Sequence, residues 1–173
     1  MKLTVFGATG GIGQEVVRQA LDAGHQVTAV VRDPARLSVT GERLEVFRAD
    51  LSDPAAVRPA VAGRDAVLSG LGARRRADAG LLDRGVRGVV SAVLKDIYAD
   101  LRAMEAELAR SATDWTVARP PRLQDKPVSG RYRTVVGGFP SKGRLMGRAD
   151  VAHAMLAMTG DAGTVKQGVG MAY

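Results

Sequence analysis

A glycine-rich turn near the amino terminus constrains the fold of this chain more than any other feature. Residues 7–13 are Gly-Ala-Thr-Gly-Gly-Ile-Gly, after a short apolar run and before apolar residues at helical spacing over 12–23. In a strand–turn–helix unit, Gly7 permits the tight turn, Gly10 lets the backbone approach a pyrophosphate, and Gly13 lets the helix pack closely. The free amides and partial positive charge of the helix would face those phosphates, although a glycine-rich turn without a ligand is the alternative. The residues expected at this dinucleotide site are Gly7, Thr9, Gly10, Gly11, Ile12 and Gly13.

Short apolar runs alternate with amphipathic stretches along the rest of the chain. The expected strands are residues 3–6, 26–31, 44–48, 66–71, 86–91, 115–118 and 168–172, and the expected helices are 12–23, 53–62, 94–110 and 149–158. Apolar strands without polar alternation, separated by helices, indicate a parallel sheet covered on both faces. We therefore predict a doubly wound α/β fold, with a mostly parallel Rossmann-type sheet in a single three-layer domain over residues 1–173. Residues 120–147, rich in Pro, Gly and Arg, are the expected substrate-side loop region.

The end of the second expected strand indicates which nicotinamide cofactor is preferred. The strand at 26–31 is followed by Arg32, where a site for NAD would carry an acidic residue for the ribose hydroxyls. An arginine at that place can bind a 2′-phosphate, which favours NADP(H). Asp33 follows directly and can compete for the ribose, and Arg32 as a plain surface charge is the alternative.

Two further strand ends are expected at the same crevice, because ligands bind at the carboxyl ends of parallel strands. After the strand at 44–48, Asp50 can accept from the adenine amino group, or equally cap the turn before Asp53, and Leu51 can pack on the adenine ring. After the fourth strand, glycines let the chain pass close to the nicotinamide ribose, with a plain turn as the alternative. The candidates there are Gly70, Leu71 and Gly72.

Composition narrows the classes of function. The net charge is +7, but the tight basic cluster at residues 74–76 stands alone and only 4% of residues are aromatic. Single-strand binders interleave basic residues with aromatic stacking platforms, so we expect no nucleic-acid partner. The arginines then form a solvated surface, or some of them meet an anionic cofactor.

Other absences exclude further classes of site. No cysteine is present, which excludes a disulfide framework, an iron–sulfur cluster and a thiol nucleophile. His25 and His153 lack a partner pattern, so no metal site is expected. No apolar run approaches the ~20 residues of a membrane span, and the chain starts without a targeting pattern. We expect a cytoplasmic protein without membrane contact, either a monomer or a weak homo-oligomer.

Several segments together resemble the atypical short-chain dehydrogenase/reductase family with NAD(P)-binding, NmrA-like domains. They are residues 6–10 (FGATG), 24–32 (GHQVTAVVR), 50–53 (DLSD) and 63–68 (GRDAVL). Within this family the chain is most similar to the biliverdin IX beta reductase/flavin reductase branch. That similarity is carried by residues 120–132 (PPRLQDKPVSGRY) and 150–156 (DVAHAML).

The resemblance implies an NADPH-dependent reductase that passes a hydride to a flavin, a biliverdin-like tetrapyrrole or a quinone. It places Ser91 near the nicotinamide, and Pro120 and Arg122 beside the nicotinamide end. The protein would chiefly orient the cofactor, which carries the difficult chemistry. A non-catalytic NADP(H) sensor that binds a partner protein, as NmrA-like regulators do, is the alternative.

The chain also departs from the family pattern. A typical short-chain dehydrogenase uses a Tyr and a Lys four residues apart, whereas here Tyr98 precedes Arg102. Arginine keeps its proton, so it supplies only positive charge, and Tyr98 on the outside of a helix is the commoner explanation. Tyr98 therefore remains a second catalytic candidate beside Ser91. The biliverdin reductase branch does not rely on that Tyr-Lys pair, so the departure puts carbonyl and alcohol chemistry in doubt.

The chain is shorter than the family pattern near residues 79–81 and 92–94. The first loss leaves little of the helix that should join two parallel strands, although such a crossover needs at least ~10–12 residues. Either the protein is trimmed there or segments are absent from this sequence, and the strain on the crossover favours the second explanation.

Overall fold

The computed structural model describes residues 1–72 and 103–173, and its elements follow the expected alternation of strands and helices over residues 1–69. The elements are β1 (Lys2–Phe6), α1 (Gly11–Asp22), β2 (Gln26–Val31), η1 (Pro34–Arg36), β3 (Leu44–Arg48), α2 (Pro54–Val61), β4 (Ala66–Ser69), β5 (Thr116–Arg119), β6 (Arg122–Gln124), β7 (Arg133–Val136), β8 (Leu145–Gly147), α4 (Arg148–Met158), η2 (Ala162–Thr164) and β9 (Gln167–Ala172). Residues 103–110 are also helical. The strand expected at 86–91, the first part of the helix expected at 94–110 and the shortened segments near 79–81 and 92–94 lie outside the described residues.

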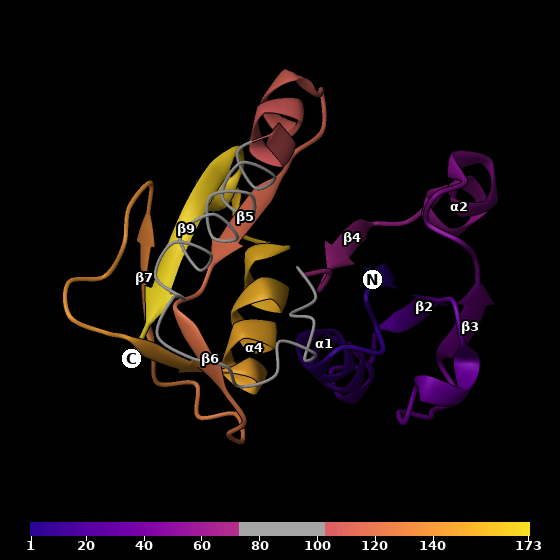
Figure 1. Cartoon of the computed structure of the whole chain (residues 1–173), viewed down its shortest axis with the longest axis horizontal. Coiled ribbons are helices and arrows are strands. Elements are labelled where there is room, and N and C mark those ends of the chain that lie inside the picture. Colours follow the sequence, from indigo (N-terminus) through magenta and orange to yellow (C-terminus); the bar gives the residue numbers. More distant parts are fainter. Residues whose placement is uncertain (73–102) are drawn as a thin grey trace, which may run out of the picture.

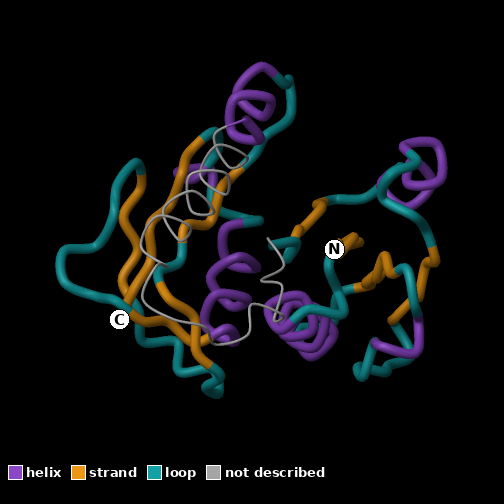
Figure 2. The backbone as a smooth tube through the Cα atoms, in the orientation of Figure 1, coloured by secondary structure: helices purple, strands orange, loops and turns teal. Residues whose placement is uncertain are grey.

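The amino-terminal strands form a four-stranded parallel sheet in the order β3-β2-β1-β4. Alternate residues of the central strand β1 pack on opposite faces, as the pleat requires. Leu3 and Val5 join the cluster that α1 contributes to, whereas the Thr4 hydroxyl donates to the carbonyl oxygen of Ala60 in α2 at 2.5 Å. The sheet is therefore covered by α1 on one face and α2 on the other, which is the doubly wound arrangement expected from the sequence (Figures 1 and 2).

The helix α1 packs on the sheet and on α4 at the same time. Its buried residues Val16, Val17 and Ala20 lie on one stripe, as their helical spacing predicts. Ala152 of α4 belongs to the same buried cluster, and the side-chain amide of Gln19 donates to the carbonyl oxygen of Ala149 at 2.9 Å. Figure 1 shows the two helices side by side between the two groups of strands.

The carboxyl-terminal strands form two smaller sheets, in the orders β5-β9-β7 and β6-β8. The pairs β5–β9 and β6–β8 are parallel, and β7 is antiparallel to β9. Met146, Val151 and Met171 are buried between these strands and α4, and Ile12 at the start of α1 packs against the same cluster. The first turn of α1 thus touches both halves of the described fold.

Residues 120–147, expected as a loop region, contain the three short strands β6, β7 and β8. These strands have only three or four residues and β7 is exposed along its whole length, so they lack the apolar pattern that identifies a strand in sequence. Within the described residues no helix is long and apolar enough to cross a membrane.

Candidate functional site

Three glycines at the carboxyl end of β1 and β4 are packed backbone against backbone. Gly7 has φ +68°, and a Cβ added there would lie 2.8 Å from the carbonyl carbon of Gly70. A Cβ on Gly13 would collide with the carbonyl oxygen of Gly7, and one on Gly70 would lie 3.0 Å from the amide nitrogen of Gly13. The sequence therefore places glycine where the turn, the helix and the next strand leave no room for a side chain, as predicted for Gly7 and Gly13.

The turn leads directly into the amino end of α1. The amide of Gly10 donates to the carbonyl oxygen of Gly7 at 2.9 Å, and Gly10, the N-cap, offers no side chain. The first helical hydrogen bond runs from the amide of Gln14 to the carbonyl oxygen of Gly10. The amides of residues 11–13 precede that bond and are available to an anion, with the partial positive charge of the helix end behind them. Thr9 lies on the same turn, and its carbonyl oxygen accepts from the Gln14 side chain at 3.3 Å.

The parallel register brings the predicted strand ends to one edge of the sheet. Phe6 is aligned with Val30 of β2 and with Ser69 of β4. Val31 is aligned with Arg48 of β3, and the next pair is joined by a hydrogen bond from the amide of Ala49 to the carbonyl oxygen of Val31 at 3.1 Å. The glycine turn, Arg32, Asp50 and residues 70–72 therefore lie along the same edge, because each follows its strand by one to three residues.

The charged residues at this edge differ in their exposure and hydrogen bonding. Arg32 is exposed, whereas the carboxylate of Asp33 accepts from the amide of Ala35 at 3.1 Å and caps η1. The carboxylate of Asp50 accepts from the amide of Ser52 at 3.0 Å. Hydrogen bonds from Ser52, together with the positive charge of Arg32 nearby, hold the pKa of Asp50 below its usual range. Asp50 thus caps a turn, one of the two roles left open for it, and Asp33 caps η1.

An apolar hollow of about 520 Å³ opens beside this edge, on the α2 side of the sheet. Its lining consists of Phe6, Leu51, Pro54, Val57, Arg58, Val61, Ser69 and Leu71. Leu51 and Leu71, predicted from separate strand ends, are thus brought together, with exposed fractions of 38% and 57%. Large exposed leucines on a mostly apolar wall suit the flat face of a planar ring.

The residues expected at the opposite end of the cofactor follow β5. Pro120 comes directly after β5, and Arg122 opens β6 with an exposed side chain. Leu123 packs on the same buried cluster as Ile12, so this strand end lies close to the first turn of α1. Among the described residues no atom lies within 4 Å of a Cβ built on Gly72, and Ser91 and Tyr98 are outside the part of the chain that the structure describes.

Two side-chain interactions near the site were not predicted from the sequence. The guanidinium of Arg119 makes a bidentate pair with Glu105, with N–O distances of 3.1 and 2.8 Å, and lies over Gly168 of β9. The buried carboxylate of Asp150 accepts hydrogen bonds from the backbone and the hydroxyl of Ser129. Both link residues more than ten positions apart, so no local pattern identifies them.

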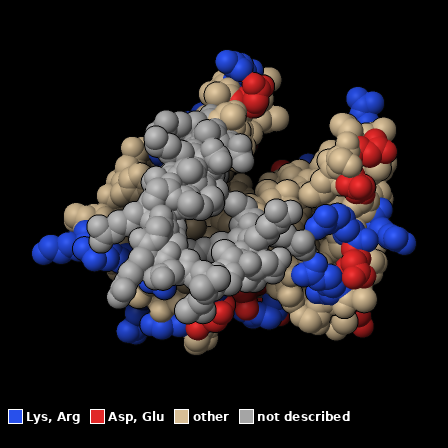
Figure 3. Space-filling model, viewed as in Figure 1, with Lys and Arg blue, Asp and Glu red and all other residues tan. Residues whose placement is uncertain are grey.

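The surface charge is not gathered at one place on the face drawn in Figure 3. Lys and Arg form several separate groups there, with Asp and Glu among them. Among the described residues of this face the surface charge is therefore mixed in sign.

Comparison with known proteins relates this geometry to reductase-like proteins. The family model described as NAD(P)H-binding matches residues 7–94 and 79–162, two segments that overlap over residues 79–94. A curated relative, the photosystem II assembly factor Ycf39 of Cyanophora paradoxa, is 33% identical over 89 residues, which are 51% of this chain and 28% of that protein. The chain thus spans about a quarter of the length of the curated relatives it matches.

Solved structures share the fold over the whole chain. ChuY, an anaerobillin reductase from Escherichia coli O157:H7, superimposes with a TM-score of 0.73 at 23% identity, covering 99% of this chain and 97% of that chain. A candidate NADH-flavin reductase from Streptococcus pneumoniae superimposes with a TM-score of 0.70 at 18% identity, covering 99% of both chains. The glycine turn fits a nicotinamide dinucleotide, because Gly10 and Gly11 place no side chain of their own at the start of α1, whose first amides can meet a pyrophosphate. With the family model spanning most of its length, this chain belongs to the NAD(P)H-binding family of Rossmann-fold proteins.

Proposed function

We propose that this protein is an NADPH-dependent reductase that passes a hydride to a flavin, a biliverdin-like tetrapyrrole or a quinone. The observation that carries the proposal is the convergence of three features on one sheet edge in a chain of the NAD(P)H-binding family. They are the glycine cradle at residues 7–13, the exposed arginine at position 32 and the apolar hollow of Leu51 and Leu71.

In this proposal the cofactor lies along the edge with its two ends on different elements. The amides at the start of α1 hold the pyrophosphate, and Arg32 pairs with the 2′-phosphate. Leu51 and Leu71 pack on the adenine. Gly70 and Gly72 let the chain pass close to the nicotinamide ribose, and Pro120 and Arg122 flank the nicotinamide end.

The protein's own part in the reaction is orientation and exclusion of water. The nicotinamide supplies the hydride when it is bound, and few side chains are then needed for chemistry. Ser91 and Tyr98 are the candidate proton donors, and a proton from solvent is the alternative. The chain acts in this proposal as one domain over residues 1–173, with 120–147 on the acceptor side, and as a monomer or a weak homo-oligomer.

A second candidate function has a specific observation in its favour. The curated relative from Cyanophora paradoxa is named an assembly factor rather than a reductase. In this second candidate function, the protein binds NADP(H) at the same sheet edge without reducing an acceptor. It then reports the redox state of the cofactor to a partner protein.

Steady-state oxidation of NADPH with FMN, biliverdin and a benzoquinone as acceptors, followed by absorbance, tests the proposal. NADH is run in parallel. Rapid loss of NADPH with at least one acceptor and slow loss of NADH is the expected result. Tight binding of NADPH and NADP⁺ with equal affinity, and no turnover of any acceptor, would favour the sensor instead.

A further inference from the structure

Arg148, the first residue of α4, lies against Gly11, the first residue of α1. A Cβ built on Gly11 would come within 2.6 Å of Cδ and 3.0 Å of Nε of Arg148. The arginine side chain therefore occupies the space that a side chain at position 11 would take. It brings a guanidinium from α4 to the point where the glycine turn enters α1.

The surroundings of this guanidinium are electrostatically unusual. Two helices begin here, and each helix start carries a partial positive charge, so a cation in the first turn is unfavourable without an anion beside it. Gly11 and Arg148 line one cavity of about 300 Å³. The other lining residues are Glu15, Asp125, Lys126, Pro127 and Ala149.

The acidic residues that face this cavity differ in how firmly they are held. The Glu15 carboxylate already accepts from Arg18 at 2.5 Å and from Gln19 at 3.2 Å. Asp125 pairs with Nη1 of Arg148 at 2.5 Å, but its side chain is 90% exposed, and exposed ion pairs contribute little to stability. Asp150, in the first turn of α4, does not line the cavity, and its buried carboxylate is bound by Ser129. Asp125 is thus the acid that an incoming anion can replace most easily.

We propose that Arg148 binds the pyrophosphate of the nicotinamide cofactor, and that Asp125 holds its guanidinium over Gly11 until the phosphates take the place of the carboxylate. This inference rests on the proposed function, because it assigns one more residue to the same cofactor. A guanidinium can pair with two phosphate oxygens at once, and the amides of residues 11–13 supply donors from the other side. Lys126 lines the same cavity and adds positive charge, with its Nζ 5.9 Å from the centroid of the Tyr173 ring.

The proposed roles of Arg148 and Arg32 can be separated with fragments of the cofactor. NADPH, NADH and ADP-ribose all contain the pyrophosphate, whereas 2′-AMP contains only the 2′-phosphate and the adenosine. Arg148→Met keeps the aliphatic packing on Gly11 and removes the charge. We expect it to weaken NADPH, NADH and ADP-ribose about tenfold each, the size of a lost charged hydrogen bond, and to leave 2′-AMP unchanged.

Isothermal titration calorimetry on the full chain measures these affinities. The matched control is Arg131→Met, which removes an exposed arginine from the neighbouring segment and is expected to bind every fragment like the unmodified protein. Asp125→Asn removes the competing carboxylate and is expected to tighten ADP-ribose severalfold. Arg148→Lys retains a positive charge and is expected to recover part of the lost affinity, which distinguishes binding from a folding defect.

Two results overturn the proposal in distinguishable ways. If Arg148→Met binds ADP-ribose as tightly as the unmodified protein, or loses 2′-AMP by the same factor, Arg148 has no pyrophosphate role while the proposed function stands. If the unmodified protein binds neither NADPH nor ADP-ribose, the proposed function fails and this assignment fails with it.

Discussion

The hydroxyl of Tyr173 donates to Oδ2 of Asp150 at 2.7 Å and ties the end of the described chain to the start of α4. The same carboxylate accepts from the amide of Ser129 at 2.8 Å and from the amide of Gly130 at 2.9 Å. The Tyr173 hydroxyl in turn accepts from the amide of Gly147 at 3.0 Å. One fully buried carboxylate thus joins the segment before β7, the start of α4 and the residue after β9.

This arrangement predicts a dependence of stability on pH. Burial by itself raises the pKa of Asp150, but the hydrogen bonds from Tyr173, Ser129 and Gly130 outweigh it and hold the pKa below the ordinary value. A group with a lowered folded-state pKa stabilises the fold above its unfolded pKa, about 3.9 for Asp, and this stabilisation is lost as pH falls through the folded pKa. We expect Asp150→Asn to lower the free energy of unfolding at pH 7 by about 1–3 kcal/mol, because amide hydrogens then face buried donors.

Urea unfolding of Asp150→Asn and the unmodified protein at pH 7 and at pH 3 checks this expectation. The difference between the two proteins should shrink at pH 3, because the unfolded carboxylate is then largely protonated and folding to a state with a lowered pKa opposes that protonation. Tyr173→Phe, which removes one donor and leaves the carboxylate, is the milder control. A difference that stays constant across this range would show that the Asp150 charge contributes nothing to stability.

The close contact between Gly7 and Gly13 predicts that position 13 tolerates no side chain. Gly13→Ala would drive its Cβ into the carbonyl oxygen of Gly7, which is backbone and cannot rotate away. We expect a loss of about 1–3 kcal/mol of stability, the usual size for overpacking, together with loss of NADPH binding. Thermal unfolding and a binding titration measure the two effects. Gly160→Ala is the matched control, since a Cβ there meets nothing within 4 Å, and an equally harmless Gly13→Ala would contradict the packing described here.

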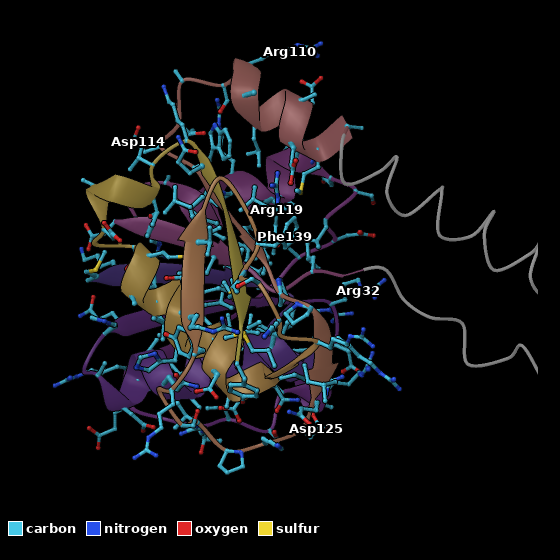
Figure 4. The ribbon with its side chains drawn as sticks, turned by 90° about the vertical axis from the view of Figure 1, so that its left-hand side faces the viewer. Arg32, Arg110, Asp114, Arg119, Asp125 and Phe139 are labelled. Atoms are coloured by element: carbon cyan, nitrogen blue, oxygen red, sulfur yellow. The ribbon has the colours of Figure 1, made fainter. Side chains whose placement is uncertain are left out.

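Arg32 is predicted to set the preference between the two nicotinamide cofactors. Because NADPH differs from NADH only in the 2′-phosphate, Arg32→Ala should weaken NADPH binding about ten- to hundredfold, or on the order of 1.5–3 kcal/mol, and change NADH binding little. Titration of both cofactors against the variant measures this. Arg110→Ala serves as the control, because Arg110 lies away from Arg32 at the end of the molecule opposite Asp125 (Figure 4). Equal weakening of the two cofactors would remove the 2′-phosphate assignment.

The parts of the site that sequence predicted are those that local chemistry determines. The glycines at positions 7 and 13 and the polar residues after each strand follow from the periodicity of neighbouring residues and from the geometry of parallel strands. Leu51 and Leu71 were predicted singly, and only the packing of the sheet shows that they share one hollow. The strands in the segment 120–147 were not predicted, because they form by long-range pairing: β7 pairs with β9, and β6 pairs with β8.

Contacts between distant segments could not be predicted for the same reason. Arg148 reaches Gly11 because α4 packs along α1, and nothing in the residues beside either position encodes that neighbour. Asp150 lies in the segment 150–156, which resembles the reductase branch. Its burial, however, depends on Ser129 and Tyr173, which come from other parts of the chain. Such residues become visible only when tertiary packing is known.

The hollow beside α2 is predicted to hold the adenine ring. Leu71→Ser replaces a side chain that is 57% exposed, so it should leave the unfolding midpoint nearly unchanged. It should weaken 2′-AMP about fivefold, because covering roughly 40 Å² of apolar side chain contributes about 1 kcal/mol. Val128→Ser, at a position on another segment that is 43% exposed, is the control for loss of surface hydrophobicity. Calorimetric titration with 2′-AMP and with ribose 5-phosphate measures the contribution of the base, since the second ligand has none. Weaker 2′-AMP binding with unchanged ribose 5-phosphate binding would place the adenine against Leu71, whereas unchanged 2′-AMP binding would require the base to lie elsewhere along the edge.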